Sequence, residues 1–290
     1  MTERYPNGSG AELADLGLAG RAPARNGAEA ADLGFADRAS ARGAAEVADL
    51  GGAEAADLGL ADRAPARDGA EVADLGFARL DLQRAARTGD PEVVFGRGKT
   101  PAQVVAALRA LHEAHPDGAV LATRLDDDAV ALVRAELPDA DLDEVARTAV
   151  LGKPRAPHGR VAVVGAGTAD LPVVRECVTT VRVFGADPDL ILDVGVAGLH
   201  RLLAQRDRID TADAVVAVAG MEAALPSVIG GLTGAPLIAV PTSVGYGWHL
   251  EGLTAWLATL NSCAPGVVTV NVDNGFGAGV AAARIARRSR

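Results

Sequence analysis

The segment RVAVVGAGTADLP, residues 160–172, decides the fold of this chain. It begins with a short apolar, β-branched run, continues through a glycine-rich turn and enters a helical pattern at 171–184. Similar apolar runs recur downstream and predict strands at 190–194, 214–219, 237–240 and 267–272. Helices are expected between and after them, at 199–209, 223–232, 250–260 and 278–288. Continuous apolar strands that alternate with helices are typical of a parallel sheet covered on both faces, so we predict an α/β, doubly wound sandwich.

The residues before this sandwich predict a small α/β subdomain. Thr100, Pro101 and Gln103 form the signature of a capped helix start, which predicts a helix at 101–115. The other elements expected here are strands at 92–95 and 119–122 and helices at 81–87, 127–136 and 142–149. The stretch 152–157 contains glycine and two prolines and is the expected linker. We therefore divide the chain into a tail (1–68), a small subdomain (69–155) and a sandwich domain (156–290).

The amino-terminal residues repeat one short motif. The tetrapeptide Ala-Asp-Leu-Gly ends at Gly17, Gly34, Gly51, Gly59 and Gly76, at spacings of 17, 17, 8 and 17 residues. These units are shorter than ordinary solenoid repeats of about 20 residues or more, and each carries few bulky apolar side chains. Burial of so few side chains does not offset the entropy of ordering the segment. We expect a disordered or transiently helical tail, with a functional repeat array as the alternative.

The charge and the cysteine content exclude several classes of protein. The formal net charge of −10 argues against binding to nucleic acid or to an anionic membrane surface. The sequence contains neither a long apolar run nor a signal-peptide pattern, so we expect no membrane span and a cytoplasmic location. The two cysteines, Cys177 and Cys263, form neither a disulfide framework nor a metal-ligand cluster, and they fit a reducing compartment.

The turn after the first strand of the sandwich is a candidate binding loop, because ligands bind at the carboxyl ends of parallel strands. Gly165, Gly167, Thr168 and Asp170 lie there, and backbone N–H groups at such a helix start can cradle an anion. A dinucleotide-binding fingerprint would require glycine at the position of Asp170. A standard dehydrogenase loop is therefore disfavoured, and a plain tight turn is the alternative interpretation.

Charged side chains follow the second and third strands. His200 and Arg201 suit recognition of a phosphate or carboxylate, and a solvated surface pair is the alternative. Met221 and Glu222 follow a glycine that permits close approach of a ligand. Glu222 is a candidate general base or cation ligand, and the alternative is a partner of the helix dipole.

The last two loops add polar groups and a thiol. Ser243 and Asn274 belong to polar, glycine-containing loops and are candidate substrate contacts. Cys263 precedes a proline-glycine turn and the last strand, where a cysteine is either a reactive group or a small buried hydrophobe. Cys177 lies in the middle of a predicted helix, and we assign it to packing.

Six loop motifs and one upstream segment carry a resemblance to a known family. The loop motifs are GAGTADLP (165–172), DVGVAGLHR (193–201), VAGMEAALPS (218–227), PTSVGYG (241–247), NSCA (261–264) and NVDNGFGAG (271–279), and the upstream segment is 81–100. Together they resemble LarB, the family that makes the nickel-pincer nucleotide cofactor and is related to the PurE-type aminoimidazole ribonucleotide carboxylases. The resemblance covers about residues 71–290 and leaves the repeated tail outside it.

The resemblance implies a carboxylase-hydrolase that converts nicotinic acid adenine dinucleotide and CO₂ or bicarbonate into pyridinium-3,5-biscarboxylic acid mononucleotide and AMP. It implies Mg²⁺ but no organic cofactor, and a homo-oligomer, an octamer in the related carboxylases. It assigns Cys263 as the nucleophile and Glu222 as the base or as a residue of the hydrolysis step. The expected substrate contacts are Gly165, Gly167, Thr168, Asp170, His200, Arg201, Met221, Ser243 and Asn274.

Two other classes of function remain as alternatives. An aminoimidazole ribonucleotide carboxylase or mutase acts on a substrate that is already an enamine-like nucleophile, and it needs no thiol. A non-catalytic nucleotide-binding or scaffold module would make the repeated tail the working part. Loss of activity in a Cys263→Ala variant favours the LarB reaction, whereas loss of a partner on deletion of residues 1–68 favours a scaffold.

Overall fold

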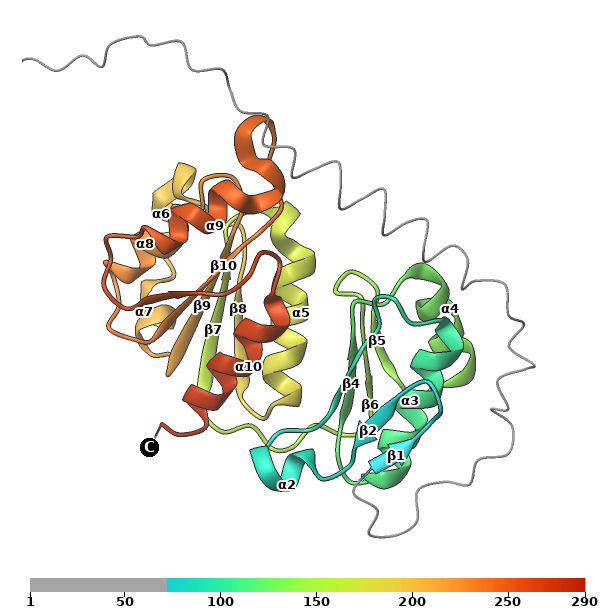
Figure 1. The fold of residues 1–290 in the computed structure, drawn as a ribbon. Helices are drawn as coiled ribbons and strands as arrows, with labels where there is room; N and C mark the ends of the chain where they lie inside the picture. The colour runs from blue at the N-terminus through green and yellow to red at the C-terminus, as the bar shows by residue number, and fades with distance from the viewer. Residues whose placement is uncertain (1–71, 290) are drawn as a thin grey trace, which may run out of the picture. The chain divides into compact units, whose positions relative to one another are not determined.

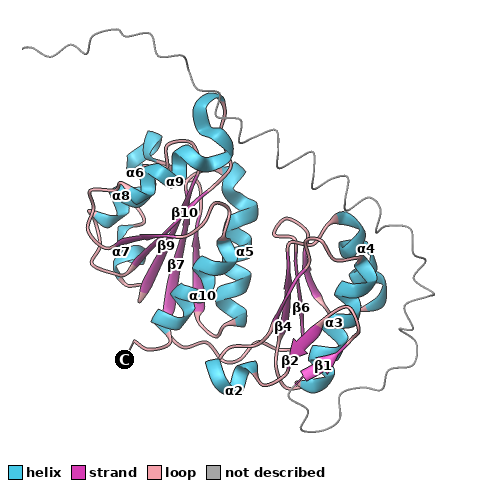
Figure 2. Cartoon of the chain, in the orientation of Figure 1, coloured by secondary structure: helices cyan, strands magenta, loops and turns pink. Residues whose placement is uncertain are grey.

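The structure is a computed structural model that describes residues 72–289. Its carboxy-terminal domain is built on one five-stranded parallel sheet with the strand order β11-β10-β9-β7-β8 (Figures 1 and 2). The strands are β7 (Arg160–Gly165), β8 (Asp187–Ile191), β9 (Ala214–Ala219), β10 (Leu237–Pro241) and β11 (Val267–Thr269). The prediction of a doubly wound α/β sandwich is confirmed.

Alternating side chains of these strands form two separate apolar clusters, one on each face of the sheet. On one face Val161 and Val163 pack with residues of α5 (Leu171–Val183) and α10 (Gly275–Ala286). On the other face Ala162 and Val164 pack with residues of four short helices. Those helices are α6 (Leu199–Leu203), α7 (Arg206–Asp210), α8 (Leu225–Gly230) and α9 (Leu253–Leu260), which Figure 1 shows together on the side away from α5. Burial of both faces explains why the central strands β7, β9 and β10 are almost continuously apolar.

The strand order places a topological switch point between β7 and β9. The chain leaves β7 through α5 on one face of the sheet and leaves β8 through α6 and α7 on the other. The loops after β7 and β9 therefore diverge to opposite faces of the sheet, and the topology predicts a crevice between them at the carboxyl ends of these two strands. In open α/β sheets this crevice is the usual ligand site.

The amino-terminal domain contains a mixed four-stranded sheet with the order β3-β4-β6-β5. Its strands are β3 (Val93–Phe95), β4 (Val120–Thr123), β5 (Asp141–Asp143) and β6 (Thr148–Leu151). One apolar cluster joins this sheet to α3 (Pro101–Ala114) and α4 (Asp127–Glu136). The predicted capping box is present, since Thr100 and Gln103 cap α3 reciprocally. A hairpin of β1 (Val72–Asp74) and β2 (Arg79–Asp81), followed by α2 (Arg84–Thr88), precedes β3.

Apolar and ionic contacts join the two domains. Ala119, Leu121 and Val150 of the mixed sheet belong to the same apolar cluster as α5 and α10. Asp90 is 1% exposed and accepts hydrogen bonds from Arg284 and Arg287 of the last helix, each at 2.6 Å. Separation of the two domains at this point would leave the buried Asp90 carboxylate without either arginine, so the contact is costly to break.

The predicted helix at 142–149 is wrong. The chain forms β5 and β6 there, and the side chain of Asp143 accepts hydrogen bonds from the backbone N–H groups of Val145 and Ala146 at 3.0 and 2.9 Å. This local bonding makes a turn, and β6 then pairs with β4 through its buried residues. Tertiary pairing and turn chemistry thus override the helical periodicity.

Several boundaries also differ from the predictions. The helix expected at 81–87 begins only at Arg84, because residues 79–81 pair with β1. The strand expected at 190–194 spans 187–191, where Pro188 is tolerated because β8 is an edge strand. The helix expected at 199–209 is split into α6 and α7, and the strand expected at 267–272 ends at Thr269. The tail 1–68 lies outside the described residues. Within residues 72–289, none of the helices is long and apolar enough to cross a membrane.

Candidate functional site

Asp170 links the loops that meet at the switch point. Its carboxylate is 3% exposed and accepts hydrogen bonds from the Thr242 hydroxyl at 2.7 Å and from the Gly167 N–H at 2.9 Å. Burial raises the pKa of Asp170 above its usual value, and the hydrogen bonds from Thr242, Gly167 and the Gly220 backbone partly oppose that rise. A single carboxylate thus ties together the loops after β7, β9 and β10. The predicted substrate contact is, in the structure, the group that shapes the mouth of the site.

The loop after β9 has an unusual backbone. Met221 and Ala223 have φ values of 55° and 47°, a region that non-glycine residues rarely occupy. The Met221 N–H donates to the Val244 carbonyl at 2.8 Å, and a Cβ placed on Gly220 would meet that same oxygen at 2.3 Å. Glu222 lies between the two strained residues, and its side chain is exposed. The surrounding contacts therefore hold a carboxylate at the surface of the crevice.

The loops after β10 and β11 are joined by Asp273. Its carboxylate accepts a hydrogen bond from the Ser243 N–H at 2.8 Å, and its own N–H donates to the Pro241 carbonyl at 2.9 Å. The side chain of Asn274 accepts from the Gly277 N–H at 2.8 Å and so forms the N-cap of α10. Ser243 presents an exposed hydroxyl at this edge, whereas the side-chain oxygen of Asn274 is already engaged.

The basic pair, His200 and Arg201, lies in α6, which follows the loop after β8. Arg201 forms an ion pair with Asp193 at 2.6 Å, and Asp193 adopts a φ of 56°. A Cβ on Gly198 would meet the Arg201 guanidinium at 2.6 Å, so a larger residue there would displace the guanidinium from this position. His200 is exposed beside it. The guanidinium is held in place by its carboxylate partner, yet it stays partly accessible to an anionic ligand.

Cys263 is exposed, but it lies in the turn between α9 and β11, before the amino end of that strand and not at a carboxyl end. Val267 pairs with Leu237, the first residue of β10, which places the segment before β11 near the amino end of the sheet. The neighbouring Ser262 hydroxyl is 2.7 Å from the Ser227 hydroxyl of α8. Cys177, in contrast, is buried in the core, and burial raises the pKa of its thiol far above the usual value. The assignment of Cys177 to packing is confirmed.

The structure thus brings most of the predicted residues to one edge of the sheet. These are Gly165, Gly167, Thr168, Asp170, Met221, Glu222, Ser243 and Asn274, with His200 and Arg201 in α6, the helix that follows β8. Cys263 of the same chain lies away from them. Sequence reasoning missed Thr242 and Asp273, which hold the loops together. Their position in the loops after β10 and β11 was the available signal, because polar groups at the carboxyl ends of strands must find partners.

The described residues contain no ready-made metal site. Within 72–289 no group of three or more His, Cys, Asp or Glu side chains is placed to hold an ion. At the crevice Asp170 and Asp273 already accept hydrogen bonds from the protein, and Asp193 is paired with Arg201. Magnesium is usually held by one or two carboxylates together with substrate phosphates. These residues do not fit a magnesium ion held by protein ligands alone.

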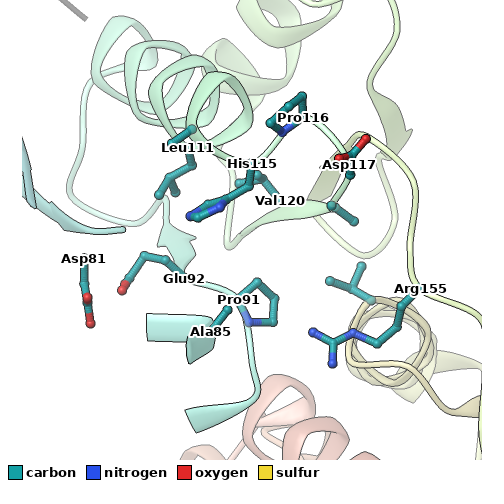
Figure 3. Close-up of a pocket in the computed structure, with 14 residues that line it drawn as sticks. Asp81, Ala85, Pro91, Glu92, Leu111, His115, Pro116, Asp117, Val120 and Arg155 are labelled. Atoms are coloured by element: carbon teal, nitrogen blue, oxygen red, sulfur yellow. The ribbon is translucent and has the colours of Figure 1, made fainter. Parts of the chain in front are cut away.

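A separate cavity of about 430 Å³ lies away from the crevice, at the amino-terminal domain. Figure 3 shows Asp81, Glu92 and His115 on one side of it and the Arg155 guanidinium on the other. Burial raises the pKa of Glu92, partly offset by Arg84. None of the predicted site residues lines this cavity, so it is not the site that the sequence indicates.

Two family models match the chain, one for each domain. Residues 72–153 match the LarB/PurE-like N-terminal domain, and residues 160–290 match the AIR carboxylase domain. The crevice described above lies within the second match. The amino-terminal match separates this chain from a carboxylase domain alone.

Two proteins of Methanocaldococcus jannaschii are similar in sequence. One, named only as uncharacterized, is 39% identical over 219 residues, which cover 72% of this chain and 84% of that protein. The other, an N5-carboxyaminoimidazole ribonucleotide mutase, is 32% identical over 130 residues, which cover 43% of this chain and 77% of that protein. The first similarity spans both domains by its length, whereas the second has the length of the carboxylase domain alone.

Proposed function

The chain belongs to the LarB family, in which a LarB/PurE-like N-terminal domain precedes an AIR carboxylase domain, and from this premise we propose that it acts on nicotinic acid adenine dinucleotide. It adds a carboxylate to carbon 5 of the pyridinium ring and cleaves the phosphoanhydride. The products are pyridinium-3,5-biscarboxylic acid mononucleotide and AMP. The observation that carries the proposal is the LarB-type domain joined to the carboxylase domain in a chain with an exposed thiol, Cys263.

The carboxylation needs a nucleophile because a cationic pyridinium does not attack CO₂. The Cys263 thiolate adds to carbon 4, and the ring electrons move to give an enamine whose nucleophilic carbon is carbon 5. Carbon 5 then bonds to CO₂ and loses its proton to a base. Expulsion of the thiolate from carbon 4 restores the aromatic ring and the free cysteine. Covalent catalysis thus divides one inaccessible step into several feasible ones.

The residues of the crevice have matching roles in this proposal. Glu222 is the exposed carboxylate at the strained turn, and we assign it to removal of the carbon 5 proton or to activation of water at the phosphoanhydride. The Thr168 N–H in the turn after β7 binds a phosphate, since the Gly167 N–H is already engaged by Asp170, and Arg201 pairs with a second anionic group. Mg²⁺ is expected to enter with the substrate phosphates, and no step above depends on protein ligands for it.

The position of Cys263 requires a second copy of the chain in this proposal. Within one chain the thiol lies at the start of β11, whereas the crevice lies at the carboxyl ends of β7 and β9. The two elements that flank Cys263 in the sequence, α9 and β11, expose large apolar side chains: Leu257, Leu260 and Val268 are 46%, 53% and 61% exposed. A homo-oligomer would cover them and bring the thiol of one copy to the crevice of another.

The decisive experiment is incubation of the full chain with nicotinic acid adenine dinucleotide, Mg²⁺ and ¹³C-bicarbonate. We expect release of AMP together with a mononucleotide that is heavier by one labelled carboxylate. Mixing Cys263→Ala chains with Glu222→Gln chains is expected to restore part of the activity, because different copies then supply the two groups. Absence of both products with the wild-type chain contradicts the proposed reaction.

The second candidate is an aminoimidazole ribonucleotide carboxylase or mutase, favoured by the similarity to the N5-carboxyaminoimidazole ribonucleotide mutase. Such a reaction does not use Cys263. Turnover of N5-carboxyaminoimidazole ribonucleotide that persists in a Cys263→Ala variant would support this candidate. We expect no such turnover, because the 32% identical segment has the length of the carboxylase domain alone.

A further inference from the structure

Arg124 of the amino-terminal domain reaches into the carboxylase domain. It directly follows β4, and its Nε and Nη2 atoms donate to the two carboxylate oxygens of Glu176 on α5 at 2.8 and 3.1 Å. Nη2 also donates to the backbone carbonyl of Asp273, in the loop after β11. One guanidinium therefore contacts both α5 and a loop of the crevice. Bidentate pairing of this kind fixes geometry as well as charge.

The backbone at Arg124 is held in a conformation that favours glycine. Its φ is 58°, which costs a non-glycine residue roughly 1 kcal/mol. The turn packs tightly on Gly96, where a Cβ would meet the Thr123 carbonyl and the Leu125 side chain at 2.9 Å. The Gly96 N–H donates to that carbonyl at 2.8 Å. A strained residue that its neighbours hold so firmly points to a role beyond local folding.

The buried carboxylate of Glu176 needs the ion pair with Arg124. Its side chain is 3% exposed, and it also accepts a hydrogen bond from the Phe276 N–H of α10 at 3.2 Å. Burial raises the pKa of Glu176, and Arg124 is the strongest opposing influence. Without Arg124 the buried carboxylate would keep only the Phe276 N–H among its hydrogen-bond partners in residues 72–289, a costly arrangement in a protein interior.

Hydrogen bonds continue from Asp273 to the mouth of the crevice. Asp273 has a φ of 56°, and its carboxylate accepts from the Ser243 N–H at 2.8 Å. The adjacent Thr242 donates to Asp170, the carboxylate that ties the loops of the switch point together. The path from Arg124 to Asp170 thus runs through Asp273, the Ser243 N–H, the peptide bond between Thr242 and Ser243, and the Thr242 hydroxyl.

We infer that Arg124 is a positioning residue through which the amino-terminal domain fixes the loops after β10 and β11 for turnover. It contacts no reacting atom and acts through Asp273 and Ser243. The inference rests on the proposed function for the reaction that is measured, but the ordering of the loops is independent of which reaction that is. It gives the LarB-type domain a part in the site of the carboxylase domain.

The test uses the full chain with the double substitution Arg124→Gly and Glu176→Gln. Glycine suits the positive φ, and glutamine removes the buried charge while it keeps an oxygen to accept from Phe276, so the variant is expected to fold. We expect kcat to fall about 10- to 100-fold, with a much smaller change in KM, because misplacement of catalytic groups costs turnover more than binding. Far-UV circular dichroism and the unfolding temperature report whether the fold is retained.

Arg147→Gly is the matched control. Arg147 also has a positive φ, of 55°, and it lines the same cavity of about 350 Å³ as Arg124, but its ion pair is with the exposed Asp127. We expect this variant to keep wild-type turnover. In the single variant Arg124→Gly, added guanidinium ion is expected to restore part of the lost kcat, because it can pair with the Glu176 carboxylate and the Asp273 carbonyl. Arg147→Gly should show no such gain.

Hydrogen exchange at the Ser243 amide separates this inference from the proposed function. That N–H is bonded to Asp273, so its exchange is expected to be faster in the double variant and unchanged in Arg147→Gly. If the wild-type chain catalyses no reaction on the dinucleotide, the proposed function fails and this exchange alone decides the role of Arg124. Wild-type kcat or unchanged exchange at Ser243 in the folded double variant overturns the inference.

Discussion

The two ends of the parallel sheet differ in how they make their turns. Loops at the carboxyl ends place non-glycine residues at positive φ, namely Asp193, Met221, Ala223, Leu250, Glu251 and Asp273. The turns that lead into β7, β8 and β11 place glycines there: Gly159, Gly185 and Gly266. Glycine adopts this region without strain, whereas other residues do so at a cost. Strain is thus stored at the edge that holds the crevice and avoided at the other.

The polar contacts follow the same division. At the carboxyl ends a buried network of Asp170 and Thr242 holds loops together. At the amino ends Arg160 and Arg208 form ion pairs with Asp189 near the surface. Strained backbone persists where surrounding structure fixes it, and it gathers at sites of binding and catalysis. The carboxyl ends of the strands therefore serve chemistry, and the amino ends serve stability. Substitutions at each end test this division.

The largest expected effect is that of Cys263→Ala, and it would contradict the division between an edge for chemistry and an edge for stability. Cys263 lies at the amino end of β11, yet the proposed reaction assigns it the covalent step. We expect Cys263→Ala to lower kcat by about a thousand-fold or more, because loss of a nucleophile removes the whole covalent route. AMP release and incorporation of labelled carboxylate, measured at saturating dinucleotide, are the readouts.

Cys177→Ala is the control for this prediction. Cys177 is fully buried in the core, so its truncation is expected to lower the free energy of unfolding by about 1 kcal/mol and to leave kcat unchanged. Equal turnover in Cys263→Ala and Cys177→Ala would remove the thiol from the mechanism, and the division between the two edges would then hold without exception.

A smaller effect is expected from a substitution at Gly220, in the loop after β9 at the carboxyl ends of the strands. In Gly220→Ala the new Cβ would meet the Val244 carbonyl at 2.3 Å and the Thr242 hydroxyl at 2.7 Å, so both loops must shift. We expect kcat to fall about 10- to 100-fold and the free energy of unfolding to fall by about 1–3 kcal/mol. Steady-state kinetics and urea denaturation measure the two effects.

Gly234→Ala is the matched control, since a Cβ there meets no atom within 4 Å. It is expected to leave kcat unchanged and to raise stability slightly, by about 0.5 kcal/mol, because alanine has fewer unfolded conformations. If Gly220→Ala proved as active and as stable as Gly234→Ala, the tight approach of the loops after β9 and β10 would have no functional weight.

The sequence predicted the sandwich because apolar runs and glycine turns are local signals. The run at 214–219 became β9 with the same bounds, and the predicted helix at 127–136 is α4. The sequence did not predict the pairing of β5 with β6, because Asp143 forms its turn through backbone hydrogen bonds that periodicity does not reveal. Nor did it predict the contact of Arg124 with Glu176, since the two residues lie 52 positions apart and meet only in the folded chain.

Within the site the sequence predicted which residues are present better than where they lie relative to one another. Asp170, Met221, Glu222 and Ser243 do gather at one edge, since the carboxyl ends of parallel strands always meet there. The position of Cys263 relative to them depends on the direction of β11, and a motif that reads NSCA does not contain that information.

The smallest expected effect tests the amino ends, where stability and not turnover should change. Hydrogen bonds from Arg208 and Arg160 lower the pKa of Asp189 below its usual value. A lowered carboxyl pKa contributes stability above the unfolded pKa of about 4, and that contribution is lost as the pH falls through the folded pKa. Asp189→Asn is therefore expected to cost about 0.5–1 kcal/mol at pH 7 after solvent screening, less at pH 3, and to leave kcat unchanged.

Urea denaturation at the two pH values measures this difference, with Asp187→Asn on the same strand as the control. Asp187 is exposed, and no ion pair is found for it among residues 72–289, so its substitution should change stability little at either pH. Added salt should shrink the effect of Asp189→Asn at pH 7, because the ion pairs are partly exposed. A fall in kcat for Asp189→Asn with stability unchanged would contradict the division, because it would place a functional group at the edge where turns are made without strain.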